Sequence, residues 1–252
     1  MSGDNLDFLM LHGVLRDPAE LQELEGAFGG AAELRRCGAL WAVVSPAPLD
    51  RASLEARFSN AEATAAIAFA HNRILASLAE RSDVAPVALG AVVTAAGLPE
   101  LISARQSELL AVLERIAGCV EYGAKLHAGV RAEASPAPAA SEPEDGRAYL
   151  RSLGRNLQRR RDARQSVEEL QADVQARLAA LAREALELTP GPGPRGRPLF
   201  SLALLTARAH VPRLIEEAEG LEQQAAALGL QLELSGPWPA YSFSRAPEAE
   251  PV

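Results

Sequence analysis

The chain has 252 residues, of which 48% are hydrophobic and 23% charged, and its formal net charge is −8 with a pI near 5.2. This composition is typical of a soluble globular protein and excludes a disordered or membrane-embedded chain. Nucleic-acid-binding proteins normally have a basic surface, so the acidic balance argues against nucleic acid as a partner. Two cysteines are too few for a disulfide framework or a zinc site, so we expect reduced thiols.

Neither secretion nor membrane insertion is indicated. The first residues include Asp4 and Asp7 and lack the basic region of a signal peptide. The longest uncharged stretch, residues 84–99, is short and is interrupted by two glycines and two prolines. We therefore expect a cytoplasmic protein without a membrane partner.

The chain opens with an apolar stretch at residues 6–15, which predicts a buried strand. Asp17 followed by Pro18 is typical of a helix start and predicts a short helix to about Phe28, which two glycines end. Residues 38–45 predict a second strand, which prolines end.

Asp50 and Asn60 are typical helix caps and predict two consecutive helices, the second over residues 61–81. Three further elements are predicted for this half. Residues 84–93 predict a strand because they are rich in β-branched side chains, and residues 97–117 predict a strongly patterned helix that Gly118 ends. Residues 119–129 alternate loosely and predict another strand.

Residues 132–146 (AEASPAPAASEPEDG) are rich in Ala, Pro, Ser and acid, and they predict an exposed, flexible linker. A seam of apolar residues at spacings of three and four then predicts one long helix over residues 149–188. After a loop rich in Gly and Pro, we expect a strand at residues 199–206 and a helix at residues 211–228 with Gly229 as its C-cap. Residues 230–235 alternate and predict a last strand.

This order of elements predicts an α+β fold of two domains, in which helices cover ferredoxin-like sheets and a long helix opens the second domain. The scarcity of aromatic residues, eleven in all, and the abundance of alanine favour closely packed helices. The predicted N-terminal domain is residues 1–131, and an acidic linker at residues 132–146 follows it. The predicted C-terminal domain is residues 147–244, and residues 245–252 form an acidic tail.

Motifs for catalysis or cofactor binding are missing. The four histidines are not at metal-ligand spacing, and the chain has no G-x-G-x-x-G, Walker A or nucleophile-elbow motif. We therefore predict no catalytic residue, no metal and no cofactor, and we expect His71 to be hydrogen bonded in the core. The basic run at residues 155–164 (RNLQRRRDAR) predicts either a solvated face or one that meets an acidic partner or the acidic linker.

The most specific segment is GPWPAYSF at residues 236–243, which holds three of the eleven aromatic residues: Trp238, Tyr241 and Phe243. Pro237 and Pro239 keep the backbone around Trp238 extended, which lowers the entropy lost when the indole docks. The segment either packs on its own core or presents preformed anchors to a partner, and the two are compatible. Together with Gly236, these residues are the candidate interaction motif.

In this context the segment resembles the end of proteins of the GvpL/GvpF family of gas vesicle proteins. Further matches follow in order along the chain: the strand at Trp41, the helix carrying His71, the stretch Glu121-Tyr122-Gly123-Ala124-Lys125 and the Tyr149-Leu150 start of the long helix. The chain departs from the family pattern at residues 86–91, where Phe and Thr are replaced, and at Tyr122, where Trp is commoner. We expect structural roles for five of the matching residues: Trp41, His71, Glu121, Tyr122 and Lys125.

The resemblance implies a non-enzymatic accessory protein of gas vesicle formation with two α+β domains, the second a modified ferredoxin-like unit. Such a protein would associate with the small hydrophobic shell protein and with other accessory proteins. It would mask the apolar surface of the shell protein or seed the ordered addition of shell protein subunits. Two alternatives stay open: a small-molecule enzyme with a pocket between the domains, and a regulator that interacts through the long helix.

Overall fold

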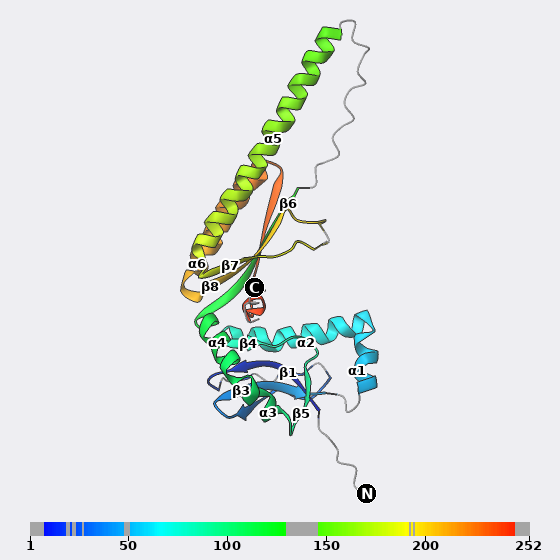
Figure 1. Cartoon of the computed structure of the whole chain (residues 1–252), viewed down its shortest axis with the longest axis vertical. Coiled ribbons are helices and arrows are strands. Elements are labelled where there is room, and N and C mark those ends of the chain that lie inside the picture. The colour runs from blue at the N-terminus through cyan, green and yellow to red at the C-terminus, as the bar shows by residue number, and fades with distance from the viewer. Residues whose placement is uncertain are drawn as a thin grey trace, which may run out of the picture. The chain divides into compact units, whose positions relative to one another are not determined.

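The computed structural model describes residues 8–18, 21, 24–26, 28–47, 51–129, 146–191, 193 and 195–244. The contacts divide the chain into two units, and each unit contains an antiparallel sheet and helices (Figure 1). Unit 1 combines residues up to Glu121 with the segment from Gly236 onward, and unit 2 is Tyr122–Ser235. The α+β class is therefore as predicted.

Unit 1 is built on a five-stranded sheet with β1 at its centre. The order is β2-β3-β1-β4, and β5 pairs with β1 as well. The strands are β1 (Phe8–Leu15), β2 (Glu33–Cys37), β3 (Leu40–Pro46), β4 (Val84–Pro86) and β5 (Val92–Thr94). Leu11 pairs with Val44 and Gly13 with Val43, so His12 is an extra residue that bulges from the ladder between β1 and β3.

Four helices complete unit 1: α1 (Arg51–Phe58), α2 (Ala61–Ala79), α3 (Leu98–Ala104) and α4 (Gln106–Ile116). The Asn60 side chain caps α2 by accepting a hydrogen bond from the Ala63 N–H at 2.9 Å, as predicted from its position. The buried stripe of α2 packs against the sheet in one cluster that includes Leu15, Val43, Ile74 and Leu75. This packing holds α2 and the centre of β1 in a fixed relation.

Unit 2 has the βαββαβ order of a ferredoxin-like fold. Its elements are β6 (Cys119–Ala128), α5 (Gly146–Leu181), β7 (Glu184–Glu187), β8 (Phe200–Ala207), the 3-10 turn η1 (Arg208–His210), α6 (Val211–Ala227) and β9 (Leu230–Trp238). The sheet order is β7-β8-β6-β9, so the second and third strands of the unit pair at one edge while the first and fourth pair at the other. The predicted ferredoxin-like sheet is thus present.

The second half of α5 packs in unit 2, whereas the described side chains of its first half are exposed. Val174 and Leu178 are fully buried, and Arg177 forms an ion pair with Glu217 of α6. Leu153 and Leu157, in contrast, are 42% and 49% exposed, and α5 extends past the end of α6 (Figure 1). The side chains of Arg155, Arg159, Arg160, Arg161 and Arg164 are all exposed.

Several elements differ from those predicted. The described residues between Asp17 and Phe28 are not helical, because the chain turns back at Gly29 and Gly30, both with positive φ, and Glu25 pairs with Ala31. The strand expected over residues 84–93 is split into β4 and β5. The long helix ends at Leu181 rather than at Leu188, since Glu184–Glu187 pairs with β8. Strand β2 lacks apolar alternation and was not predicted.

The division into units also differs from the predicted boundaries. Residues 236–244 were expected in the same domain as the long helix, whereas the contacts group this segment with unit 1. The boundaries between the units fall inside β6 and β9, where the sequence shows no break in composition. The predicted linker up to residue 145 and the predicted tail lie outside the described residues.

Candidate interaction site at the C-terminal segment

Residues 236–244 comprise the last three residues of β9 and the 3-10 helix η2 (Tyr241–Phe243), and the contacts group them with unit 1. The aromatic residues of the segment differ in burial: Phe243 is fully buried, Tyr241 is half-buried and Trp238 is 41% exposed. The Gly236–Pro237 peptide bond is cis. The segment therefore contributes one aromatic side chain to the core, while another keeps part of its surface exposed.

Phe243 is held by Arg115 of α4. The guanidinium carbon lies 5.4 Å from the centroid of the phenyl ring, and Nη1 donates a hydrogen bond of 3.1 Å to the Phe243 carbonyl. A guanidinium over an aromatic face is attracted by the ring quadrupole, more strongly where water is excluded. The ring and backbone of the last described turn are thus attached to α4 together.

Glu121 holds the same turn through its carboxylate. One oxygen accepts a hydrogen bond from the Ser242 N–H at 2.8 Å, and the other accepts one from the Ser242 hydroxyl at 2.7 Å. Burial raises the pKa of Glu121, and the two hydrogen bonds from Ser242 oppose that shift because they favour the charged form. The carboxylate has the two donors that a buried acidic group needs.

Tyr241 lies between α2 and this carboxylate. Its hydroxyl donates to Oδ1 of Asn72 at 3.3 Å, and its ring centroid is 6.4 Å from that of His71. Burial, together with the charge of Glu121, raises the pKa of Tyr241 to about 12. The phenol is therefore a stable hydrogen-bond donor rather than a group that titrates near neutral pH.

His71 continues this arrangement into the centre of unit 1. Its Nδ1 lies 2.9 Å from Nδ1 of His12, and Nε2 of His12 lies 2.9 Å from the Ser45 hydroxyl. Burial lowers the pKa of His12 to about 3, with a smaller contribution from His71. Burial also lowers the pKa of His71 to about 4, which the nearby Val87 backbone opposes. Both rings are neutral at pH 7, and one donates to the other.

A serine next to a histidine pair is also an arrangement found in nucleophilic catalysis, but burial argues against that chemistry here. His12 and Ser45 have no exposed surface, so a substrate cannot reach the hydroxyl. Gly26 closes the same region, because a Cβ at that position would lie 2.5 Å from Oγ of Ser45. The contacts favour a structural role for this chain of polar groups.

The residues selected from the sequence are divided between the two units. His71 and Glu121 are buried in unit 1, Trp41 packs against the unit 1 core while partly exposed, Tyr122 is buried, and Lys125 is exposed on β6 of unit 2. The enzyme alternative required His71, Glu121 and Lys125 around one accessible cleft, and the first two of these side chains are buried within unit 1.

Three residues that hold the segment in place were not predicted: Asn72 and Arg115, which contact it, and Ser242, which belongs to it. They carry no local motif, and their partners are more than a hundred positions away in the sequence.

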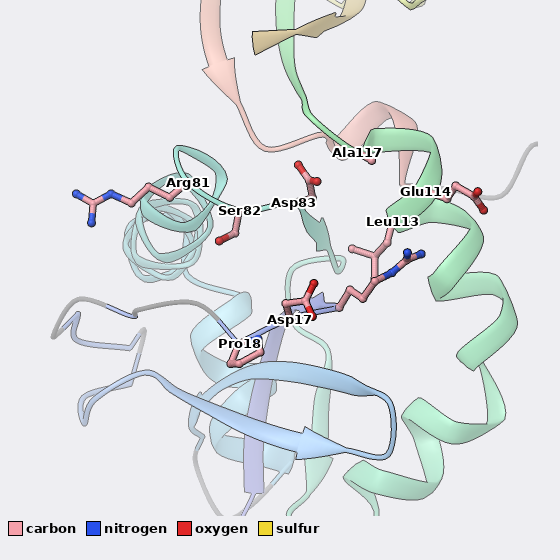
Figure 2. A pocket seen from close by; sticks show the side chains of 9 residues that line it. Asp17, Pro18, Arg81, Ser82, Asp83, Leu113, Glu114 and Ala117 are labelled. Carbon is pink, nitrogen blue, oxygen red and sulfur yellow. The ribbon is translucent and has the colours of Figure 1, made fainter. Parts of the chain in front are cut away.

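A pocket of about 420 Å³ in unit 1 carries charges of both signs (Figure 2). Arg16 and Arg81 line it together with Asp17, Asp83 and Glu114. Asp17, predicted as a helix cap, thus lies at a pocket instead, and Asp83 accepts a hydrogen bond from the Gly118 N–H at 2.9 Å. The mixed charges favour no single class of ligand.

Among the described residues, no group of three or more His, Cys, Asp or Glu side chains is placed to hold a metal ion. None of the helices in the described part of the chain has the length and apolar character needed to cross a membrane.

Comparison with known proteins identifies the family. Residues 9–245 match the family described as "Gas vesicle synthesis protein GvpL/GvpF". The chain belongs to the GvpL/GvpF family. The match includes the buried pair His12–His71, the Glu121–Ser242 contact and the whole GPWPAYSF segment.

Individual GvpL/GvpF proteins agree with this assignment. The chain is 30% identical to gas vesicle protein L of a Streptomyces species (strain CB03234), over 99% of this chain and 97% of the relative. The crystal structure of GvpF from Anabaena sp. PCC7120 is similar with a TM-score of 0.67 and 16% identity, over 98% of this chain and 99% of that one. GvpF from Microcystis aeruginosa gives a TM-score of 0.62 and 16% identity, over 96% and 100%. These two structures support the fold.

Proposed function

We propose that this GvpL/GvpF protein is a non-enzymatic accessory protein that binds the small hydrophobic shell protein of the gas vesicle and assists its nucleation or assembly. Membership of a gas vesicle family along nearly the whole chain supports the biological context. In the same proposal the protein acts in the cytoplasm on nascent vesicles and contacts further accessory proteins there.

The observation that carries the binding proposal is the exposure of Phe69 on α2. This phenyl ring is 71% exposed, the highest value among the large hydrophobic side chains in the described part of the chain. Leaving a phenyl ring in water is unfavourable, and aromatic side chains are the usual anchors of protein interfaces. A hydrophobic partner gains by covering it.

The surroundings of Phe69 fit an apolar partner. Ala66 precedes Phe69 by three positions, so the two lie on the same side of α2. Ala66 also lines a shallow hollow of about 500 Å³ where α1 meets α2, and its lining consists of three alanines and three polar or charged residues: Ala56, Ala63, Ala66, Arg57, Asn60 and Glu62. Small side chains let a partner approach the helix closely, and Phe69 projects beside them. This surface is therefore the proposed contact for the shell protein.

The test is co-purification of the shell protein with the full-length chain after co-expression. Phe69→Ser should lower the amount of captured shell protein about tenfold or more, the size of effect that loss of an interface anchor produces. Leu101→Ser is the matched control, because Leu101 is a 39% exposed apolar residue on α3 of the same unit. Both variants should unfold at the temperature of the unsubstituted protein. Full capture by Phe69→Ser would refute the proposed surface, and no capture by the unsubstituted chain would refute the function.

A further inference from the structure

Unit 2 carries a pocket of about 430 Å³ that the proposed function does not use. It lies where β6, β8 and β9 meet the loop between β7 and β8, and that volume is suited to a small molecule. Side chains alternate along β6: Ala124 and Leu126 are fully buried on one face, while Lys125 and His127 line the pocket from the other. Lys125 belongs to the stretch that resembles the family motif, and it is the only lysine in the chain.

His127 forms the floor of this pocket with unused hydrogen-bonding capacity. The residue is only 5% exposed, and neither ring nitrogen has a hydrogen-bond partner among the described residues. Its Nε2 lies 3.7 Å from the Glu233 carboxylate, which is too far for a hydrogen bond. A buried polar group without a partner costs free energy, so a ligand that pairs with the ring would be favoured. The Ser201 hydroxyl lines the pocket as well.

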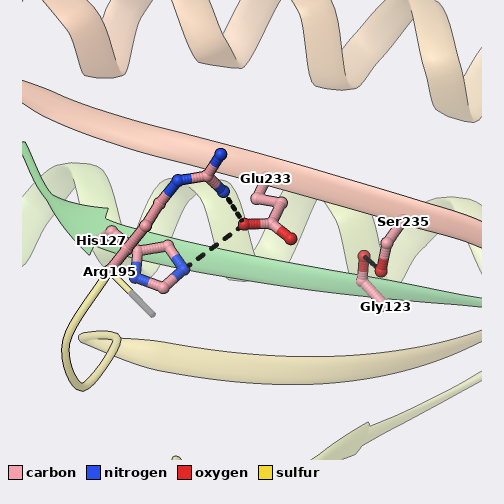
Figure 3. A network of polar contacts seen from close by, with 5 residues as sticks. All are labelled: Gly123, His127, Arg195, Glu233 and Ser235. Atoms are coloured by element: carbon pink, nitrogen blue, oxygen red, sulfur yellow. Dashed lines mark hydrogen bonds and ion pairs between the residues drawn. The ribbon is translucent and has the colours of Figure 1, made fainter. Parts of the chain in front are cut away.

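Two cationic side chains and one carboxylate line the pocket: Lys125, Arg195 and Glu233. Lys125 is exposed and forms no hydrogen bond or ion pair within the part of the chain that the structure describes. Arg195 pairs with Glu233, and Figure 3 shows its guanidinium and the His127 ring directed at the same carboxylate. Because Arg195 occupies Glu233, the charge of Lys125 is left without a counterion. A guanidinium has five N–H donors, so Arg195 keeps donors for a second acceptor.

We propose that this pocket binds a small ligand through an oxyanion, a carboxylate or a phosphate group. His127 donates one N–H from the buried floor, and Lys125 supplies the opposite charge from the rim, with Arg195 beside it. Charge-assisted hydrogen bonds of this kind are stronger than neutral ones, and they are complementary to an anion. The site is independent of the shell-binding surface, since Phe69 lies in the other unit.

The experiment follows the ring signals of His127 by NMR in the full-length, histidine-labelled protein. A spectrum of His127→Asn assigns the signals. Sodium phosphate and sodium acetate are added in separate titrations, with ionic strength held constant by sodium chloride. We expect a saturable shift with at least one anion and a dissociation constant in the millimolar range, about −4 kcal/mol at 1 mM. Saturation by phosphate alone identifies a phosphoryl ligand, and saturation by acetate alone a carboxylate ligand.

Substitutions at the rim distinguish anion binding in this pocket from a general effect of added salt on the protein. Lys125→Met should weaken binding about tenfold, and Lys125→Arg should restore it, because only the charge is shared with the original side chain. Arg213→Met is the control, because Arg213 is an exposed residue of α6 away from the pocket residues. No saturable shift with either anion, or equal binding by Lys125→Met, would overturn the proposal. Loss of shell-protein capture by Phe69→Ser would leave it unaffected.

Discussion

Both carboxylate oxygens of Glu121 accept hydrogen bonds from Ser242, which follows it by 121 positions in the sequence. This double contact attaches the last described turn of the chain to the first residues of β6. Leaving one partner of a buried hydrogen bond unsatisfied costs more free energy than the intact bond contributes to stability. Substitution of Glu121 should therefore lower the stability of unit 1.

Replacement of Glu121 by Gln should destabilise the protein by about 1–3 kcal/mol. The neutral amide of Gln loses the charge-assisted contacts, because its oxygen accepts from the Ser242 N–H without the carboxylate charge and its nitrogen can only donate to the Ser242 hydroxyl. Urea denaturation measures the change in the free energy of unfolding. Glu100→Gln, at an exposed position of α3, is the matched control and should change stability little. Equal stability of the two variants would contradict the assigned role of the carboxylate.

Acidification should destabilise unit 1 between pH 6.5 and about 4. The pKa of His12 is lowered to about 3 and that of His71 to about 4, so the unfolded chain binds more protons than the folded one in this interval. Stability is therefore present above pH 6.5 and falls as the pH falls, by up to about 1.4 kcal/mol per pH unit for each histidine. The raised pKa of Glu121 acts in the opposite direction and reduces the slope.

Thermal unfolding as a function of pH measures this slope. His71→Gln should flatten it even if the variant is less stable at pH 7, because one of the two linked protons is removed. His210→Gln changes an exposed histidine and should keep the slope of the unsubstituted protein. An unchanged slope in His71→Gln would show that the buried pair does not cause the pH dependence.

Phe243→Ala should cost about 3–5 kcal/mol, because the ring is fully buried and its removal leaves a cavity next to Arg115. Trp238→Ala should cost no more than about 1–2 kcal/mol, since a 41% exposed indole loses less buried area. Chemical denaturation of the two variants provides the comparison. A larger loss for Trp238→Ala would mean that the indole is the main anchor of the segment.

Two glycines should respond to alanine with opposite signs. At Gly26 a Cβ would lie 2.4 Å from Cβ of Ser45, which is itself fully buried, so Gly26→Ala should destabilise by about 1–3 kcal/mol. At Gly220, inside α6, a Cβ meets no described atom within 4 Å, and Gly220→Ala should stabilise by about 0.5–1 kcal/mol. The melting temperatures of the two variants measure these changes. A higher melting temperature for Gly26→Ala would contradict the close approach of Gly26 to Ser45.

Elements with local signals were predictable from the sequence. Asn60 caps α2 because its short side chain reaches a free N–H of the first turn, and this requires no information from elsewhere in the chain. Gly118 and Gly229 follow α4 and α6 with φ of 69° and 70°, a conformation that glycine adopts without a steric penalty. Such signals located most helices of both units.

Elements that depend on pairing were not predictable in the same way. Asp17 and Pro18 favour a helix start, yet Leu21 and Leu24 pack against the unit 1 core from a non-helical segment. The apolar seam of α5 would continue to Leu188, but the Arg183 N–H donates to the Leu205 carbonyl and the chain enters β7 instead. In both cases contacts with a distant segment outweigh local preference.

The contacts of the candidate interaction segment were likewise not predictable from the sequence. Its composition indicates that the aromatic residues matter, but the sequence does not show that Phe243 is buried while Trp238 is exposed. Asn72 contacts Tyr241 across 169 positions, and no local pattern links the two. The pocket around His127 depends equally on β6, β9 and a loop that are far apart in the chain.

The boundaries inside β6 and β9 have a consequence for the order in which the chain folds during synthesis. Unit 2 is one continuous stretch, Tyr122–Ser235, and all of it has been made before residue 236 is added. Unit 1 starts before unit 2 in the chain but lacks the Tyr241–Phe243 turn until these residues have been added after unit 2. Of the two units, the one that is started first is therefore completed last, and a chain that stops before residue 241 leaves His71 and Glu121 without the turn that contacts them.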